Sequence, residues 1–180
     1  DIFARDPFMG HFTFLHNGQA QNDLLIVGLH LASGQHLNKN HDAAMAVLRR
    51  KLDEGRADGT VLPPGEFDIL LGGDLNASKY DDKVEQFFIE MNTGDWAVLA
   101  GENYPATRLA GVPLAPKSHL DYLIVTRKTA TQSGLLGDEI ADPEAKVHQD
   151  LAHGQWDTFR RTFSDHFPVT TCVGVMADND

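Results

Sequence analysis

Short apolar runs, each bounded by polar residues or glycine, recur along this chain. Runs of this length that are rich in Leu, Ile or Val predict buried strands. The four clearest are Leu24 to Leu29, Phe67 to Leu71, Leu120 to Thr126, and Phe167 to Val175. A weaker alternation from Gly10 to Leu15 predicts a fifth strand, and Asn17-Gly18 predicts a hairpin turn between it and Leu24.

Two further stretches have apolar residues at helical spacing. The first extends from about His41 to Asp53, with Asn40 as its N-cap, and the second from about Asp82 to Met91. The polar stretch from Ser133 to Arg161 has no firm periodicity, which is typical of a functional or mobile connection. Strands and helices alternate first and then give way to strand and loop. This order favours an α/β sandwich, in the wider α+β sense, over an all-β domain.

The composition is that of one globular domain, which we take to cover residues 1–180. Of these 180 residues, 42% are hydrophobic and 23% are charged, which suffices for a single core but not comfortably for two. No run of about 18 apolar residues would span a bilayer, and no leader sequence is visible. The chain starts at Asp1 rather than Met, so we expect a truncated or processed N-terminus and lean towards a cytoplasmic location.

The single cysteine and the acidic balance narrow the range of functions. Cys172 has no cysteine partner and lies in a predicted strand, so we expect a buried, inert thiol rather than a nucleophile. The 15 basic and 26 acidic residues give a net charge of −11, which argues mildly against tight nucleic-acid binding. Phosphodiester chemistry stays compatible with this charge, because a bound metal ion can reverse the charge of a site locally.

Ionisable and amide side chains gather where the predicted strands begin or end. They are His30, Asp74, Asn76, Asp121, Asp165 and His166. Such groups beside a buried strand face a desolvation cost, so they need partners, a metal ion or a functional reason. Taken singly, each has a structural interpretation, such as a turn residue, a cap or a satisfied core histidine. Taken together, their placement at the ends of separate strands favours a shared site.

Five segments of the chain match motifs of a known family. Gly72 to Asn76 resembles a glycine-Asp-x-Asn motif, Ser118 to Leu123 an (I/L)-D-Y motif, and Ser164 to Val169 a Ser-Asp-His-x-Pro-Val motif. Val27 to Leu31 resembles a strand that carries a catalytic histidine, and Phe3 to Pro7 an Arg-Glu-Pro segment. In the order in which they occur along the chain, these segments resemble the C-terminal part of the endonuclease/exonuclease/phosphatase superfamily, in its deoxyribonuclease I-like branch.

The resemblance implies a four-layer β-sandwich flanked by helices, with its N-terminal part missing from this chain. The family's early Asn and its metal-binding Glu would precede Asp1, and no Glu of this chain occupies a matching motif. We therefore expect the isolated chain to have an incomplete metal site and to be inactive alone. We also expect it to self-associate, to pair with the missing portion or to be only partly stable, because an uncovered sheet face is apolar.

The resemblance further implies that the site binds Mg²⁺ or Mn²⁺. Asp165 would bind this ion together with the missing Glu, because hard carboxylate oxygens suit both metals. Asp74 and Asn76 would orient the attacking water, contact the phosphate or hold a second metal ion.

Three residues would complete the catalytic set that Asp74 and Asn76 begin. Asp121 would hydrogen-bond His166 and fix its tautomer. His166 would act as general base or as a phosphate-stabilising imidazolium. His30 would donate a proton to the leaving group or bind phosphate.

Basic and hydroxyl side chains near these motifs are candidates for substrate binding. Arg5 has the guanidinium geometry that matches phosphate oxygens. Thr107 and Arg108 precede Asp121 on a predicted loop and would line the same site. Arg160 and Arg161 are the densest positive charge near Asp165, although they also fit a solvated surface pair.

These residues together imply divalent-metal-dependent hydrolysis of phosphate esters, with a phosphodiesterase or nuclease as the first choice. DNA, a lipid and a small phosphoester are all open as substrates. His30 favours the deoxyribonuclease and sphingomyelinase-like branches, the acidity disfavours a processive nucleic-acid enzyme, and no apolar hairpin for membrane docking is evident. The alternative is a non-catalytic relative that uses the same fold for binding or scaffolding.

Overall fold

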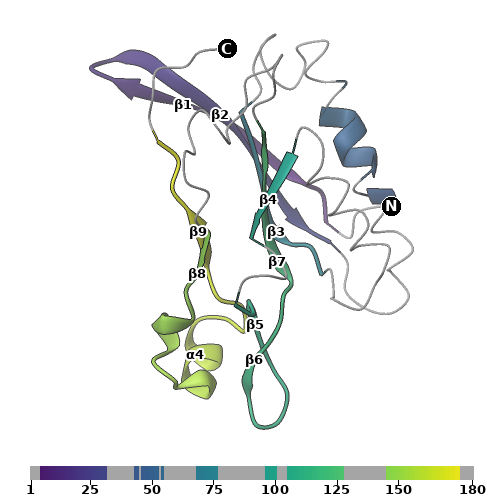
Figure 1. The fold of residues 1–180 in the computed structure, drawn as a ribbon, viewed down its shortest axis with the longest axis vertical. Helices are drawn as coiled ribbons and strands as arrows, with labels where there is room; N and C mark the ends of the chain where they lie inside the picture. Colours follow the sequence, from purple (N-terminus) through teal and green to yellow (C-terminus); the bar gives the residue numbers. More distant parts are fainter. Residues whose placement is uncertain are drawn as a thin grey trace.

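A computed structural model of the protein describes residues 5–31, 43–44, 46–52, 54, 68–76, 96–100, 105–127 and 145–174. In this part of the chain, helices and strands form a mixed α/β arrangement (Figure 1). A five-stranded sheet lies at its centre. A helix covers one face of this sheet, and a two-stranded sheet lies against the other.

The central sheet has the strand order β1-β2-β3-β7-β4. Its members are β1 (Phe8–His16), β2 (Gln19–His30), β3 (Ile69–Asp74), β7 (Asp121–Thr126) and β4 (Trp96–Ala100). β2 and β3 are parallel, whereas every other neighbouring pair is antiparallel. The C-terminal ends of β2 and β3 therefore meet the N-terminal end of β7 at one end of the sheet.

The helix within residues 43–54 covers the first face of the sheet. Its described residues are α-helical, which confirms the sequence prediction for them. Leu48 and Leu52 pack in one buried cluster with Val27 and Leu29 of β2 and Ile69 of β3. Burial of a Leu or Ile side chain contributes about 1.5–3 kcal/mol, so this contact holds the helix against the strands that lead into the candidate site.

The opposite face packs against the small sheet of β8 (Ala145–Val147) and β9 (Val169–Thr171). Leu24, Val125 and Ala145 are buried together there, with Val169 packed against them. Because successive side chains of a strand point to opposite faces, β2 contributes to both cores. This two-sided burial explains the nearly continuous apolar run in its sequence.

A third small core lies beyond the end of the central sheet. It involves β5 (Arg108–Ala110), β8, the 3₁₀ helix η1 (Gln149–Ala152) and the helix α4 (Trp156–Thr162). The strand β6 (Ala115–Ser118) pairs with β5. Leu109, Phe159 and Phe167 are buried together in it, and the last two rings lie 5.1 Å apart. This core anchors the segment that carries Asp165 and His166.

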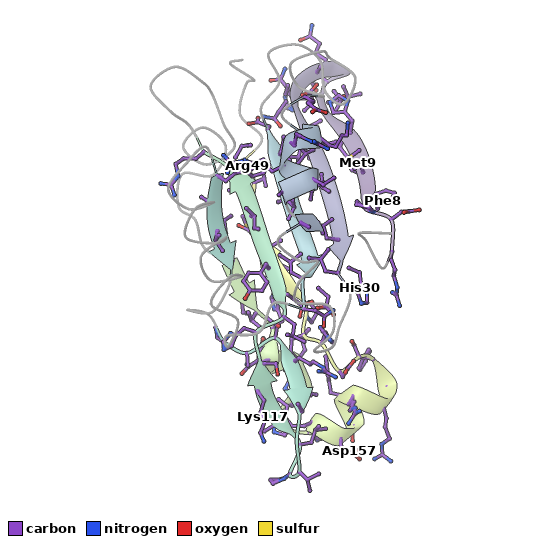
Figure 2. The ribbon with its side chains drawn as sticks, turned by 90° about the vertical axis from the view of Figure 1, so that its right-hand side faces the viewer. Phe8, Met9, His30, Arg49, Lys117 and Asp157 are labelled. Atoms are coloured by element: carbon purple, nitrogen blue, oxygen red, sulfur yellow. The ribbon has the colours of Figure 1, made fainter. Side chains whose placement is uncertain are left out.

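The β1–β2 hairpin confirms a sequence prediction and adds a feature that the sequence analysis did not recognise. Asn17 and Gly18 have φ values of 52° and 79°, the positive values that tight hairpin turns require. On β1, the side chains of Phe8 and Leu15 are each 65% exposed, and Met9, Phe12 and Phe14 are also exposed. Figure 2 shows Phe8 and Met9 on this outer strand. The exposed apolar side chains of this hairpin therefore gather on its outer strand, β1.

Three predictions about the C-terminal third are wrong. The strand predicted from Phe167 to Val175 is reduced to Val169–Thr171, since Pro168 has no amide hydrogen for a sheet. The supposedly irregular stretch from Ser133 to Arg161 contains β8, η1 and most of α4. Cys172 is exposed and follows β9, so it is not a buried strand thiol.

Two other predictions lie outside the described residues, namely the helix from about Asp82 to Met91 and the N-cap at Asn40. The helices that the structure does describe are all too short or too polar to cross a membrane.

Candidate functional site

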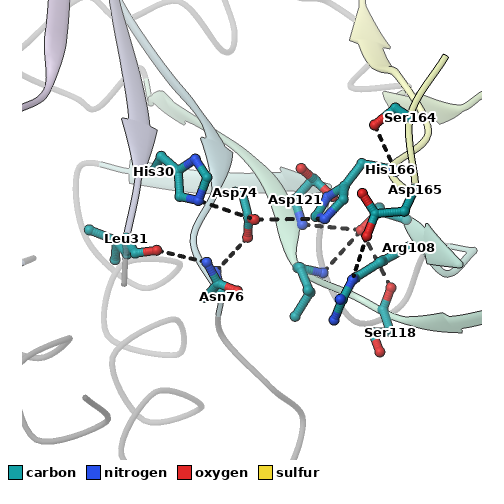
Figure 3. Close-up of polar contacts among 12 residues, drawn as sticks. His30, Leu31, Asp74, Asn76, Arg108, Ser118, Asp121, Ser164, Asp165 and His166 are labelled. Carbon is teal, nitrogen blue, oxygen red and sulfur yellow. Dashed lines mark hydrogen bonds and ion pairs between the residues drawn. The ribbon is translucent and has the colours of Figure 1, made fainter. Parts of the chain in front are cut away.

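Three strands place one polar residue each in a single row at the end of the central sheet. In the register of the strands, His30 of β2 is the partner of Asp74 of β3, and Asp74 is the partner of Asp121 of β7. Cross-strand partners project from the same face of a sheet. The three side chains therefore approach one another although 91 positions separate His30 from Asp121 (Figure 3).

The glycine before Asp74 makes this close approach of β2 and β3 feasible. Gly73 has a φ of 136°, a backbone conformation that other residues rarely adopt. A Cβ atom at this position would overlap the carbonyl oxygen of Leu29 on β2. Local backbone chemistry thus requires glycine at the position that presents Asp74 to the site.

His166 reaches the same row from the segment between α4 and β9. Its Nδ1 atom lies 2.8 Å from Oδ2 of Asp121, and its Nε2 atom lies 3.8 Å from Oδ2 of Asp74. The hydrogen bond to Asp121 raises the pKa of His166, and the negative charges of Asp121, Asp74 and Asp165 act in the same direction against partial burial. His166 is therefore held between two carboxylates that favour its protonated form.

His30 contacts Arg5, which lies just before β1. Nη1 of Arg5 is 3.0 Å from Nδ1 of His30. Because a guanidinium group can only donate, Nδ1 must accept, and the proton of the neutral ring resides on Nε2. This Nε2 atom lies 3.8 Å from Oδ2 of Asp74. Arg5 thus presents His30 to the site as a hydrogen-bond donor.

Asn76 is held beside Asp74 by two hydrogen bonds. Its backbone amide donates to Oδ1 of Asp74 at 2.9 Å, and its Nδ2 atom donates to the carbonyl oxygen of Leu31 at 2.7 Å. The second bond orients the side-chain amide, so that Oδ1 is the atom left to face a ligand. Burial raises the pKa of Asp74, although the amide of Asn76 and the two histidines oppose this effect.

The described residues contain one cluster of His, Cys, Asp and Glu side chains with the spacing of a metal site. It consists of Asp74, Asp121 and His166, whose potential ligand atoms all lie within 4.8 Å of one another. Carboxylate oxygens suit Mg²⁺ and Mn²⁺. A buried carboxylate with a raised pKa, such as Asp74, gains from a nearby cation. The two carboxylates of this cluster offer the oxygen donors that a divalent cation binds, and His166 would add a nitrogen donor only in its neutral form.

Asp165 does not belong to this cluster in the structure. Its carboxylate Oδ2 lies 3.3 Å from Nε of Arg108. Burial acts to raise the pKa of Asp165, but the hydrogen bond from Arg108 and the nearby charge of His166 outweigh it, so the pKa is lowered. The expected metal ligand is thus paired with a cation of the same chain, which was itself expected to bind substrate.

Thr107 is also placed differently from its expected role as a substrate contact. It is only 1% exposed, and its Oγ1 atom accepts hydrogen bonds from two backbone amides. It does not line a surface that a ligand reaches. Arg161 pairs with Asp157 one helical turn away on α4. Neither Arg160 nor Arg161 has a hydrogen bond or ion pair to the site within the described part of the chain.

The sequence analysis missed the internal roles of Thr107 and Arg108. Both depend on β5, which has only three residues and no recognisable alternation. The spacing of Trp156, Phe159 and Phe163 at helical intervals was a usable signal for α4. No comparable signal in the sequence indicated the pairing of Arg108 with Asp165.

Comparison with known proteins adds no assignment at the level of sequence. No family model and no curated protein matches this chain. The chemistry of the site is therefore argued from its geometry. That geometry combines two carboxylates, one imidazole that both of them face, a second imidazole that offers an N–H group, and the side-chain amide of Asn76.

Proposed function

We propose that this protein hydrolyses phosphate esters with the help of Mg²⁺ or Mn²⁺, and that it acts as a phosphodiesterase or nuclease. One observation carries the proposal: His30, Asp74, Asp121 and His166 converge from four separate stretches of chain at one end of the sheet. The proposed fold is a deoxyribonuclease I-like sandwich, of which the mixed α/β part described above would form a portion.

In this proposal Asp121 and His166 act as a pair. A carboxylate only accepts hydrogen bonds, so Nδ1 of His166 carries the proton in the bond to Asp121. The free Nε2 atom then accepts a proton from water in the neutral ring, or donates to a phosphoryl oxygen when the ring is protonated. The raised pKa of His166 increases the protonated fraction near neutral pH.

His30 and Asn76 would act on the substrate from the other side of Asp74. The Nε2–H group of His30 would donate to an ester or phosphoryl oxygen, because Arg5 occupies the other ring nitrogen. Oδ1 of Asn76 would accept from a water molecule and orient it. A bound divalent ion would supply positive charge to the phosphoryl oxygens.

Three classes of substrate are compatible with the proposed site. The net charge of −11 disfavours a long polyanion held by many phosphate contacts. The exposed apolar side chains of β1 form a surface suited to contact with an apolar partner, so a lipid substrate stays open. DNA, a lipid phosphodiester and a small aryl phosphate therefore belong in the same test.

The test is hydrolysis of plasmid DNA, a lipid phosphodiester and an aryl phosphate with Mg²⁺ or Mn²⁺, with EDTA as the blank. The assay should use both the 180-residue chain and the protein as encoded by its complete gene. We expect hydrolysis of at least one substrate, and we expect His166→Ala to abolish it. Hydrolysis no faster than the EDTA blank for every substrate would refute the proposal and favour a binding role.

A further inference from the structure

The hydroxyl group of Thr107 forms the centre of a buried hydrogen-bond cluster. Its Oγ1 atom accepts from the backbone amides of Leu120 at 3.0 Å and Asp121 at 3.1 Å. The same atom lies 3.4 Å from the carbonyl oxygen of Ser118, to which it donates its own hydrogen. The hydroxyl thus holds the main chain at the point where β7 begins.

The main chain around Thr107 is also hydrogen-bonded to the segment that carries His166. The amide of Phe167 donates to the carbonyl oxygen of Thr107 at 2.7 Å, and the amide of Leu109 donates to that of Asp165 at 2.8 Å. Arg108 and His166 form a backbone bridge between these two bonds. Residues on both sides of His166 are therefore fixed to residues on both sides of Arg108.

The same cluster extends to the strand that carries Asp74. The amide of Leu75 donates to the carbonyl oxygen of Leu120 at 2.8 Å. Leu120 is therefore bonded on both sides: its amide donates to Thr107, and its carbonyl oxygen accepts from Leu75. A shift of Leu120 would disturb Asp121 and Asp74 together.

We propose that Thr107 is a positioning residue, whose hydroxyl aligns Asp121 with His166 so that their side chains form a hydrogen bond. This inference rests on the proposed function for its biological meaning, although the alignment itself is a property of the structure. Thr107 touches no substrate. It acts through the backbone of Leu120 and Asp121.

In this proposal the hydroxyl group of Thr107, rather than the packing of its side chain, aligns Asp121 with His166. Valine has nearly the shape of threonine but no acceptor, so Thr107→Val would leave the buried amide of Leu120 and the partly buried amide of Asp121 without their partner. The start of β7 would relax to find other acceptors. Serine keeps the hydroxyl, so Thr107→Ser should retain the alignment.

Thr126, at the other end of β7, offers a matched control. It is fully buried, and its Oγ1 atom accepts from the amide of Ile69 at 3.1 Å. Thr126→Val therefore removes a buried threonine hydroxyl at the end of β7 that lies away from the site. The comparison separates a general loss of stability from a specific loss of alignment.

The measurement is the ¹H NMR resonance of the proton on Nδ1 of His166, which should appear far downfield and vanish in His166→Gln. This proton is present whether the ring is neutral or protonated, so the resonance reports the hydrogen bond rather than the charge. We expect it to be lost in Thr107→Val and kept in Thr107→Ser and Thr126→Val. If Thr107→Val does not fold, Thr107→Cys replaces it, since sulfur is a weak acceptor.

Activity provides an independent second readout. Thr107→Val should lower kcat by about tenfold or more with KM changed less than about twofold, and Thr107→Ser should restore it. An unchanged resonance in the folded valine or cysteine variant, or an equal loss in Thr126→Val, would overturn the inference. If the resonance behaves as expected but no substrate is hydrolysed, the positioning role stands and the proposed function fails.

Discussion

Nδ1 of His166 lies 2.8 Å from Oδ2 of Asp121, although 45 positions separate the two residues in the chain. This bond fixes the ring, and it directs Nε2 towards Asp74, whose Oδ2 lies 3.8 Å away. The pair has the arrangement in which a carboxylate orients an imidazole for proton transfer. Its geometry leads to predictions for activity and for stability.

Asp121→Asn should keep the fold and lower kcat by about 10²–10⁴-fold. Asparagine has the same shape, but its neutral amide holds the ring less firmly and allows the wrong tautomer. The measurement is steady-state hydrolysis together with a circular dichroism spectrum. Asp150→Asn serves as the control, because Asp150 lies on η1 and pairs with Lys146. Ordinary turnover by the Asp121 variant would remove this pair from the mechanism.

The same hydrogen bond should make stability depend on pH in a defined direction. Since the folded protein raises the pKa of His166, it binds a proton more tightly than the unfolded chain does. The resulting stabilisation is complete below the ordinary histidine pKa of about 6.5 and disappears as the pH rises through the raised value. The difference in free energy of unfolding between wild type and Asp121→Asn should therefore shrink with increasing pH.

Urea unfolding in chelator at a series of pH values from about 5.5 to 8.5 measures this difference, because the interval brackets the titration of histidine. Other groups that titrate alike in both proteins cancel in the comparison. A difference that stays constant, or that grows with pH, would contradict the assigned hydrogen bond.

Gly73→Ala should be among the most destabilising single changes near the site. Alanine would meet both an unfavourable φ of 136° and a direct overlap with the Leu29 carbonyl oxygen. We expect a loss of about 2–4 kcal/mol in the free energy of unfolding. Gly18→Ala is the matched control, since its φ is also positive but no atom lies within 4 Å of the added carbon. Equal losses for the two variants would show that overlap at Gly73 is unimportant.

The exposed strand β1 should cause copies of the 180-residue chain to associate. β1 is an edge strand of the described sheet and contains no Lys, Arg, Asp, Glu or Pro, the residues that usually protect such edges. An antiparallel pairing of two copies centred on Phe12 would place Met9 opposite Leu15 and Gly10 opposite Phe14. The strand carries no Lys, Arg, Asp or Glu side chain that would oppose this contact.

Size-exclusion chromatography with light scattering over a concentration series tests the association. Phe12→Lys should shift the protein towards the monomer. Leu151→Lys, which replaces an exposed leucine on η1, should not. A monomer at every concentration, or equal effects of the two lysines, would exclude β1 as the contact.

The site could be predicted from the sequence largely because its residues follow recognisable apolar runs. His30, Asp74 and Asp121 each adjoin a strand whose Leu, Ile and Val content identifies it without knowledge of its partners. Their meeting in one row depends on the strand order and register, which tertiary packing sets and no local pattern of residues encodes. Their shared position at strand ends favoured a common site, and the resemblance to a known family supplied the roles expected of each residue.

The parts that could not be predicted depend on short elements and long-range contacts. Thr107 and Arg108 precede or begin a three-residue strand, too short for any periodicity. The ion pair of Arg108 with Asp165 joins residues 57 positions apart, and either charge alone is an ordinary surface residue. Cys172 was misplaced because an apolar run continued past the point where strand pairing ends.

A divalent cation should stabilise the protein through Asp74. Burial raises the pKa of this carboxyl group, so its negative charge at neutral pH costs free energy that a bound cation would offset. At a cation concentration of about ten times Kd, the stabilisation is about 1.4 kcal/mol. For a chain of this size it corresponds to a rise in Tm of roughly 3–6 °C. Thermal unfolding with Mg²⁺, Mn²⁺ or EDTA measures it.

The Asp74→Asn variant makes this test specific. Without the charge, it should lose the cation-dependent rise in Tm, and in EDTA at neutral pH it should be at least as stable as wild type. Asp150→Asn should keep the full rise, since its exposed carboxylate lies outside the cluster. A similar rise in the Asp74 and Asp150 variants would mean that the cation binds elsewhere. An unaltered Tm of the wild type with either metal would show that the described carboxylates do not suffice to hold it.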